Sequence, residues 1–401
     1  MNAYNPDKQT APGDGGRQAA NETRGPAAPP GLPPGKQALI TMNGAKDMKE
    51  ITGSFQIEGR ALSCERYGNG HINETYLLRT DRPHDYILQK INSRVFHDVP
   101  ALMDNIIAVT DHLRKQNPDP RQVLTLVPTT QGLPYLSTQS GEYWRLYEFI
   151  TDSICLEKPE SAEDLRQSGV AFGDFQNRLA DFPSASLTET IPRFHDTPDR
   201  YRLFHVALRE DRARRLETAR QEIDSYLARE AEAAVLMDLR RRGELPLRVT
   251  HNDTKLNNVM LDAATRTPLC VIDLDTVMPG LAANDFGDSI RFGASTAAED
   301  ERDLDRVELS LALYGAYAEG FLRACGKGLT KTEIDTLPHG VKLMTLECGV
   351  RFLTDYLNGD TYFHTSRPGQ NLDRARTQIK LVSDMEKKWD AIRRIIDEQI
   401  R

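Results

Sequence analysis

Apolar and polar residues alternate in short runs along the first part of the chain. The runs in residues 51–80 and 85–92 are separated by Gly, Asn and Asp, as in antiparallel strands joined by hairpins. Apolar residues then recur at helical spacing in residues 99–117, where we expect a helix. Two more strands are expected at residues 123–129 and 142–150. The pattern predicts a β-rich N-terminal part that contains one long helix.

Long helical stretches follow these short runs. They are expected at residues 161–182, 199–242, 303–325, 331–358 and 373–400. Ser161 and Asp164 open the first of them with the pattern of a capping box. In the charged run 209–224 both signs recur three and four positions apart, so we interpret the run as the solvated face of a helix.

This change of pattern divides the chain into two lobes. Residues 46–150 form the smaller, β-rich lobe, and residues 151–401 form a larger, mainly helical lobe. Residues 1–45 are rich in Pro, Gly, Ala and Asn and bury too little apolar surface to offset the entropy of ordering, so a disordered tail is expected there. The predicted fold class is α+β with two lobes.

Composition narrows the class of protein. The chain has 401 residues and a net charge of −8, which argues against a nucleic-acid-binding surface. Five cysteines, an odd number without C-x-x-C spacing, indicate reduced thiols. The first residues lack a basic segment followed by an apolar one, so we expect no signal peptide, and no apolar run approaches the ~18 residues of a membrane span. We therefore expect a cytoplasmic protein without a membrane or nucleic-acid partner, whose oligomeric state the sequence leaves open.

Polar residues suited to phosphoryl transfer are concentrated in residues 249–277. Asp253 is followed five positions later by Asn258, the spacing of the kinase catalytic loop H-R-D-x-x-x-x-N, in which Asp orients the attacking hydroxyl and Asn binds magnesium. Twenty positions after Asp253, the run "VIDLD" contains Asp273, and Asp275 follows it. Strand alternation would place both carboxylates on one face. Hard oxygen ligands suit Mg²⁺ or Mn²⁺. The sequence predicts Asp253 as the catalytic carboxylate and Asn258, Asp273 and Asp275 as metal ligands.

The neighbouring polar residues admit structural roles. Asp285 belongs to a D-F-G triplet but follows Asp253 by 32 positions, more than kinases place between the two functions. We expect Asp285 and Asp288 to cap a helix or to brace the catalytic loop. His251 is expected to hold that loop. Lys255 either meets the transferring phosphate or is solvated.

Candidate nucleotide contacts lie in the smaller lobe. Gly68 and Gly70 in "YGNGHINETY" would let backbone amides approach phosphates closely, although Asn73 stands where a third Gly would complete the pattern. The backbone near Glu148 and Ile150 lies where a kinase hinge meets adenine.

Lys90, at the end of the run "DYILQK", is a candidate to pair with phosphates, with Asp104 as its acidic partner. Gln89 occupies the neighbouring register position. Alternation along the strand leaves open which of the two side chains faces inward.

Several motifs of the chain carry a family resemblance: "YGNGHINETYLL", "ILQKIN", "THNDTKLNNVMLD", "VIDLDTVMPG", "NDFGDSIR" and "ECGVRFLTDYLNGDTYF". With these motifs the chain resembles the aminoglycoside phosphotransferase family of kinase-like small-molecule kinases, and within it the N-acetylhexosamine 1-kinases. The resemblance implies a bilobal protein-kinase-like fold and ATP- and Mg²⁺-dependent phosphoryl transfer. It also implies Asp253 as catalytic carboxylate and Asn258 with Asp273 as magnesium ligands.

Two features refine this resemblance. Asn252 stands where antibiotic kinases usually have Gly, which favours the hexosamine-kinase branch. Arg351 and Tyr362 match residues expected to contact the sugar, with a surface salt bridge and a half-buried loop as their structural alternatives. The predicted reaction is phosphorylation of the anomeric hydroxyl of N-acetylglucosamine or N-acetylgalactosamine, the epimer being open.

Two other functions are considered. One is a kinase of choline, homoserine or an aminoglycoside, for which a cationic acceptor would require uncompensated acids around the pocket. The other is a non-catalytic nucleotide-binding module. The presence of Asp253, Asn258 and Asp273 together argues against the second.

Overall fold

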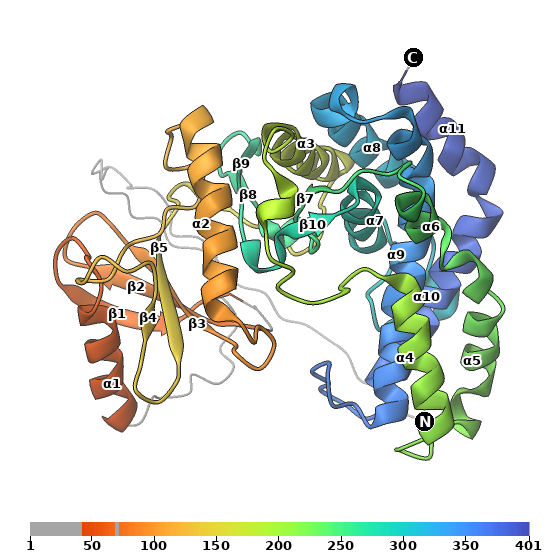
Figure 1. The fold of residues 1–401 in the computed structure, drawn as a ribbon, viewed down its shortest axis with the longest axis horizontal. Coiled ribbons are helices and arrows are strands. Elements are labelled where there is room, and N and C mark those ends of the chain that lie inside the picture. Colours follow the sequence, from red (N-terminus) through yellow and green to blue (C-terminus); the bar gives the residue numbers. More distant parts are fainter. Residues whose placement is uncertain (1–41, 69–71, 401) are drawn as a thin grey trace, which may run out of the picture. The chain divides into compact units, whose positions relative to one another are not determined.

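The computed structural model describes residues 42–68 and 72–400. Most of the predicted tail lies outside these residues. Helix α1 (Met42–Gly53) begins before the predicted end of the tail at residue 45. Residues 46–401 form one compact unit (Figure 1).

An antiparallel five-stranded sheet dominates the N-terminal part. Its strands are β1 (Ala61–Arg66), β2 (Glu74–Thr80), β3 (Tyr86–Ile91), β4 (Leu136–Ser137) and β5 (Tyr143–Glu148), in the order β1-β2-β3-β5-β4. Period-two alternation separates the two faces. Leu88 and Leu146 pack with Phe55, which follows α1, whereas Ile87 and Tyr147 pack with helix α2 (Val99–Gln116).

Two predictions for this part are wrong. The expected strand at residues 51–53 is the last turn of α1, and residues 123–129 form only single bridges, Leu126 to Tyr147 and Thr129 to Phe55. Val123 and Leu124 are nevertheless buried, in the cluster that contains α2. A short apolar run can be a buried connection as well as a strand, and tertiary packing decides between them.

The C-terminal part is mainly helical. Its helices are α3 (Ala162–Arg178), α4 (Thr197–Glu210), α5 (Arg220–Leu227), α6 (Val235–Arg241), α7 (Ala282–Gly293), α8 (Leu311–Cys325), α9 (Lys331–Asn358), α10 (Gln370–Lys387) and α11 (Trp389–Gln399). Short strands accompany them: β6 (Ser153–Ile154), β7 (Arg248–Thr250), β8 (Val259–Asp262), β9 (Pro268–Val271) and β10 (Met278–Gly280). The predicted α+β class is confirmed, and so is the capping box of Ser161 and Asp164.

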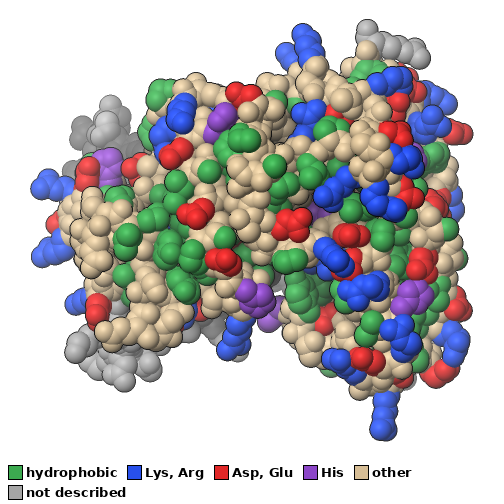
Figure 2. All heavy atoms as spheres, in the orientation of Figure 1, with side chains coloured by type: hydrophobic (Ala, Val, Ile, Leu, Met, Phe, Trp, Pro, Cys, Tyr) green, Lys and Arg blue, Asp and Glu red, His purple; other side chains and the backbone are tan. Residues whose placement is uncertain are grey.

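The expected helix over residues 199–242 is three separate helices. Asp211 ends α4 in the left-handed conformation, at φ 36°, and Arg214 has φ 55°. The charged run 209–224 is therefore not one continuous helix face. On the face drawn in Figure 2, acidic, basic and apolar side chains are interspersed.

Helices α7 and α9 pack at very short range (Figure 1). A Cβ atom on Gly287 would overlap the carbonyl group of Gly340, and one on Gly340 would overlap the carbonyl group of Ala283. Only glycine permits this backbone approach. The contact holds α7 against α9, the helix that carries Arg351. Within the described part of the chain, no helix has the length and apolarity needed to cross a membrane.

Candidate active site

Two strand pairs bring the sequence motifs together. Strand β7 pairs with β10, and β8 pairs with β9, so the loops 251–258 and 272–277 that leave these strands lie side by side. The N–H of Ile272 donates to the carbonyl oxygen of Asn258 at 2.9 Å, which joins the two loops directly.

Asp253 and Asn258 are in direct contact. The side-chain amide of Asn258 donates to the carbonyl oxygen of Asp253 at 2.8 Å and to Oδ2 at 3.2 Å. Nζ of Lys255 lies 2.8 Å from Oδ1. Burial opposes the ionised form of Asp253, but the charge and hydrogen bond of Lys255, together with other nearby cationic groups, outweigh it and hold the pKa below its usual value. Asp253 is therefore ionised at neutral pH and able to accept a hydrogen bond from a hydroxyl.

Asp273 follows the end of β9 in the left-handed conformation, at φ 60° and ψ 55°. Its carboxylate stays open to solvent and makes no hydrogen bond or ion pair within the described residues. The surrounding protein displaces part of the water around this carboxylate, and this desolvation raises its pKa to about 6. The negative charges of Asp275 and Asp253 add to the rise. An unpaired carboxylate in the field of two other negative charges is a favourable position for a cation.

Asp275 points elsewhere. Its Oδ1 lies 2.5 Å from Nη1 of Arg145 on β5, and both side chains are almost completely buried. Its Oδ2 accepts a hydrogen bond from the amide of Asn73. The prediction that Asp273 and Asp275 share one face of a strand is wrong, because β9 ends at Val271 and a left-handed residue followed by a 3₁₀ turn separates their directions.

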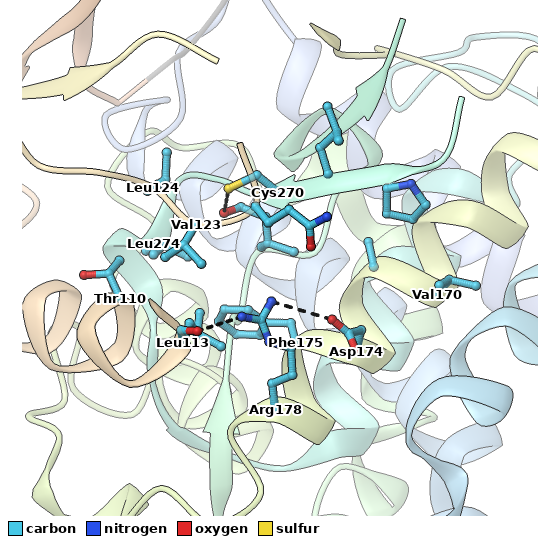
Figure 3. Close-up of a pocket in the computed structure, with 15 residues that line it drawn as sticks. Thr110, Leu113, Val123, Leu124, Val170, Asp174, Phe175, Arg178, Cys270 and Leu274 are labelled. Atoms are coloured by element: carbon cyan, nitrogen blue, oxygen red, sulfur yellow. Dashed lines mark hydrogen bonds and ion pairs between the residues drawn. The ribbon is translucent and has the colours of Figure 1, made fainter. Parts of the chain in front are cut away.

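Leu274 anchors the turn between these two acids. Its side chain is buried in the apolar cluster that contains α2, beside a hollow that residues of α2, α3 and β9 line. Figure 3 shows this hollow, with Arg178 between the carbonyl of Leu113 and the carboxylate of Asp174. The turn that carries Asp273 is thus fixed from behind by apolar packing.

Helix α7 braces the catalytic loop. The buried carboxylate of Asp285 accepts from the backbone N–H groups of His251 and Asn252 at 2.9 and 2.8 Å, and Asp288 accepts from the N–H of Thr254 at 3.0 Å. The bracing role is confirmed. The alternative role as helix cap is wrong, since Leu281 occupies the N-cap position of α7 without a side-chain cap.

His251 holds the loop, as predicted. Its Nε2 lies 2.9 Å from the carbonyl oxygen of Ile272 and donates to it, so Nδ1 is the acceptor for the N–H of Asp253 at 3.3 Å. Phe172 and Phe175 pack edge-on against the ring. The histidine is buried and has no free nitrogen for acid–base chemistry.

The predicted nucleotide contacts are partly visible. Gly68 has φ 73°, a conformation that favours glycine, while Gly70 lies outside the described residues. At the end of β5, the N–H of Glu148 donates to Thr125, whereas the N–H of Ile150 has no partner among the described residues. Ile150 therefore has a backbone donor available where a hinge would meet adenine.

The register of β3 separates Gln89 from Lys90. Oε1 of Gln89 accepts from Nε and Nη2 of Arg145 at 3.0 and 2.8 Å, on the sheet face that covers Asp275. Nζ of Lys90 pairs with Glu142, on the opposite face, and the predicted pair with Asp104 is not formed. A phosphate contact for Lys90 stays a prediction, and this register favours Gln89 and Arg145 as the inward-facing groups.

Arg351 and Tyr362 come together, although eleven positions separate them. The guanidinium carbon of Arg351 lies 5.1, 5.5 and 5.9 Å from the ring centroids of Phe194, Phe363 and Tyr362. No acidic side chain of the described residues forms an ion pair with Arg351. We call Arg351 and these three rings the aromatic wall.

Asp355 supports this wall. Its carboxylate accepts from the backbone N–H groups of Thr361, Tyr362 and Phe363 at 2.9, 2.8 and 2.9 Å, and from the amide of Asn371 at 2.9 Å. The loop after α9 is thus held by one buried carboxylate. Tyr362 remains 61% exposed, so its ring is accessible to a ligand.

The residues fit a magnesium–nucleotide site. Within residues 42–68 and 72–400, no three His, Cys, Asp or Glu side chains converge on one point. Mg²⁺ does not need such a set, because one or two protein oxygens with substrate phosphates and water complete its shell. Asp273 offers an unpaired carboxylate, and Asn258 turns its amide nitrogen to Asp253, which leaves Oδ1 as a free acceptor.

Several residues of this site have no role that the sequence predicts, namely Asn73, Arg145, Phe194 and Phe363. In the sequence, Asn73 only interrupts the glycine pattern, and Arg145 is a single cation within the apolar run of β5. Arg145 is a usable signal in the sequence, because a buried cation in a strand requires an acidic partner. Phe194 and Phe363 carry no comparable signal.

Residues 63–320, more than half of the chain, match the family described as the Phosphotransferase enzyme family (APH). An aminoglycoside phosphotransferase from Alicyclobacillus acidocaldarius has a similar structure, with a TM-score of 0.59 and 14% identity over 90% of this chain and 98% of that chain.

Two further solved structures have the same fold. Amicoumacin kinase hAmiN, in complex with AMP-PNP, Ca²⁺ and Ami, has a TM-score of 0.54 and 13% identity over 85% of this chain and 93% of its own. Choline kinase from Cryptosporidium parvum has a TM-score of 0.52 and 12% identity over 89% and 100%. The predicted protein-kinase-like fold is confirmed. The chain belongs to the Phosphotransferase enzyme family and is a kinase-like small-molecule phosphotransferase.

Proposed function

We propose that the protein is an ATP- and Mg²⁺-dependent kinase that phosphorylates the anomeric hydroxyl of N-acetylglucosamine or N-acetylgalactosamine. The products are the sugar 1-phosphate and ADP. One observation carries the acceptor class, namely the aromatic wall, in which the guanidinium of Arg351 is framed by rings and has no carboxylate partner among the described residues. Guanidinium donates to neutral oxygens in a planar fork, and rings cover the apolar face of a sugar.

The charges around the wall favour a neutral acceptor over an amine. Glu347 and Asp355 lie four positions before and after Arg351 on α9, and both carboxylates are already occupied, the first by His195 and Thr197 and the second by backbone donors. Arg200 is a second cation near the wall. Burial lowers the pKa of Arg200, and Arg351 is close enough for its charge to lower that pKa further. An ammonium group such as that of choline would meet two cations and no free acid.

The chemistry assigned to the catalytic loop is positioning. Asp253, ionised beside Lys255, would accept a hydrogen bond from the anomeric hydroxyl and finally its proton, as the oxygen bonds to the γ-phosphorus and the bond to the ADP oxygen breaks. Asp273 and Oδ1 of Asn258 would hold Mg²⁺, with Asp275 and Arg145 fixing the turn that carries Asp273. The bound metal would neutralise the phosphate charge.

The same convergence disfavours a non-catalytic module. Asp253, Asn258 and Asp273 come from two loops and meet at one place, with Asp285 and Asp288 bracing one loop and Leu274 anchoring the other. A protein that only binds nucleotide has no use for an ionised carboxylate held ready for a second substrate.

A panel experiment tests the proposal. The purified chain is incubated with ATP, Mg²⁺ and one acceptor at a time: both N-acetylhexosamines, choline, ethanolamine, homoserine and an aminoglycoside. ADP release is followed, and the product is identified by ³¹P NMR. We expect turnover with an N-acetylhexosamine and a phosphorus resonance coupled to the anomeric proton.

Two controls sharpen the result. The methyl glycoside of the same sugar has its anomeric oxygen blocked and should give no turnover, and the Asp253→Asn variant should report any contaminating kinase. Turnover of the methyl glycoside would move the reaction to another hydroxyl. Turnover of choline with no hexosamine activity would overturn the acceptor class.

A further inference from the structure

A buried histidine–glutamate pair lies between the catalytic loop and the aromatic wall. Nδ1 of His195 is 2.9 Å from Oε1 of Glu347, and Nε2 is 3.0 Å from the carbonyl oxygen of Asn252. Oε2 of Glu347 accepts from the hydroxyl of Thr197 at 2.7 Å. The His195 ring is 6% exposed and Glu347 is fully buried.

The hydrogen bonds define the protons on the ring. Both nitrogens of His195 face oxygen acceptors, a carboxylate and a backbone carbonyl, so each nitrogen donates when the ring is doubly protonated. Burial opposes ionisation of Glu347, but His195, Arg200 and Arg351 together hold the pKa of this carboxyl below its usual value. The pair is therefore a buried, hydrogen-bonded unit whose outward-directed bond goes to the carbonyl of Asn252 in the loop 251–258.

This outward bond falls on one particular peptide group. The peptide that joins Asn252 to Asp253 has its N–H on Nδ1 of His251, at 3.3 Å, and its carbonyl on Nε2 of His195. Asn252 has φ 64°, an uncommon value for a residue with a side chain. Two histidines 56 positions apart thus clamp the peptide that sets the direction of the Asp253 side chain.

The same pair is continuous with the aromatic wall. The rings of His195 and Phe194 are 4.4 Å apart, and Arg351 lies over Phe194. Glu347 and Arg351 are four positions apart on α9 and so share a helix face. A shift of the aromatic wall would therefore move His195 and change its hydrogen bond to the carbonyl of Asn252.

We propose that His195 and Glu347 are positioning residues for phosphoryl transfer, which clamp the Asn252–Asp253 peptide from the side of the acceptor. This rests on the proposed function only in that Asp253 is the carboxylate that meets the acceptor hydroxyl. Neither residue touches the reacting atoms. Their effect is on the direction of Asp253, and a misplacement of about 1 Å at such a group costs ~10²-fold in rate.

The test compares two histidine–glutamate pairs of the full-length chain. His195→Ala removes the clamp, and His195→Gln keeps a donor near the position of Nε2. His205 pairs with Glu230 at 2.9 and 3.0 Å, in a half-exposed position away from the catalytic loop, so His205→Ala is the matched control. Each variant is assayed with the acceptor that the wild type turns over best.

We expect His195→Ala to lower kcat by about 10- to 100-fold with an unchanged KM for ATP. His195→Gln should recover most of the loss, and His205→Ala should stay within about twofold of the wild type. An unchanged kcat in His195→Ala, or equal losses in the two alanine variants, would overturn the proposal. So would a rise in both KM values that tracks a fall in Tm.

A readout without turnover separates this proposal from the proposed function. Hydrogen exchange of the segment 249–258 should become faster in His195→Ala, while exchange of α8 stays as in the wild type. That result would support the clamp even if no hexosamine is phosphorylated. Unchanged exchange in the segment would refute the clamp even if hexosamine turnover is established.

Discussion

The side-chain amide of Asn73 donates a hydrogen bond to the carboxylate of Asp275, 202 positions further along the chain. Oδ1 of Asn73 also accepts from the N–H of Asn92 at 3.0 Å, so the residue links its own segment both to the end of β3 and to the loop 272–277. Arg145 holds the other oxygen of Asp275. These bonds join the N-terminal sheet to the turn that carries Asp273.

This link predicts a large cost for breaking the buried pair. Arg145→Met leaves the carboxylate of Asp275 buried and without its cation, which should destabilise the protein by about 3–5 kcal/mol. Arg66→Met, which removes the exposed pair of Arg66 with Glu74 on β1 and β2, is the control and should change stability by less than about 0.5 kcal/mol. Urea unfolding measures both, and similar values for the two variants would show that the buried pair has no special role.

Asp253 should be essential for turnover and dispensable for nucleotide binding. Asp253→Asn keeps the shape of the side chain but removes the charge that accepts the hydroxyl proton, so kcat should fall by about 10²-fold or more. Titration with ATP should give a Kd within about threefold of the wild type, because the change concerns the acceptor. A near-normal kcat would remove Asp253 from the mechanism.

Asp273 and Asp285 should fail in different ways. Asp273→Ala is expected to fold normally and to lose Mg²⁺-dependent activity, since its carboxylate makes no other bond within the described residues. Asp285→Ala orphans the buried donors of His251, Asn252 and Gln176 and should cost about 3 kcal/mol or more in stability. The measurements are Tm and activity against Mg²⁺ concentration. If excess Mg²⁺ restores Asp285→Ala, the two roles are exchanged.

The raised pKa of Asp273 predicts how pH acts on the metal-free protein. The unfolded chain loses this proton near the usual value of 3.8 and the folded chain near 6, so the group's contribution to stability falls as pH rises between these values and is constant above them. Asp273→Asn should therefore match the wild type at pH 4 and exceed it at pH 7.5, by at most about 1 kcal/mol because the carboxylate is open to water.

Magnesium should reverse this difference. Above pH 6 the cation stabilises the ionised carboxylate of the wild type, whereas in Asp273→Asn it has lost its charged ligand. Melting curves at pH 4 and 7.5, with and without Mg²⁺ and ATP, give four values for each protein. A wild type that Mg²⁺ and ATP do not stabilise at pH 7.5 would contradict the assignment of Asp273.

Arg351 should act on the acceptor and not on ATP. Arg351→Ala removes charge-assisted hydrogen bonds and should lower kcat/KM for the hexosamine by an amount equivalent to ~1.5 to 3 kcal/mol, with KM for ATP nearly constant. Arg374 lies 5.3 Å from the ring of Phe352, next to the wall, and Arg374→Ala is the matched control. Equal losses for both substrates with a lower Tm would identify Arg351 as a structural residue.

The sequence by itself determined the features that depend on near neighbours. The five-residue spacing of Asp253 and Asn258 places the two side chains in contact, the Ser161–Asp164 capping box starts α3, and helical periodicity locates α2 and α9. Each of these rests on backbone geometry within one or two turns of chain. Local rules therefore suffice for them.

Tertiary structure alone decided the rest. The pairs Asn73–Asp275 and His195–Glu347 join residues 202 and 152 positions apart, and no local pattern specifies a partner at such a distance. Asp273 has φ 60° because Leu274 is drawn into the core and Asp275 to Arg145, which overrides the alternation that the apolar run suggests. Buried charges must find partners wherever the packed chain supplies them, and only the folded arrangement determines where that is.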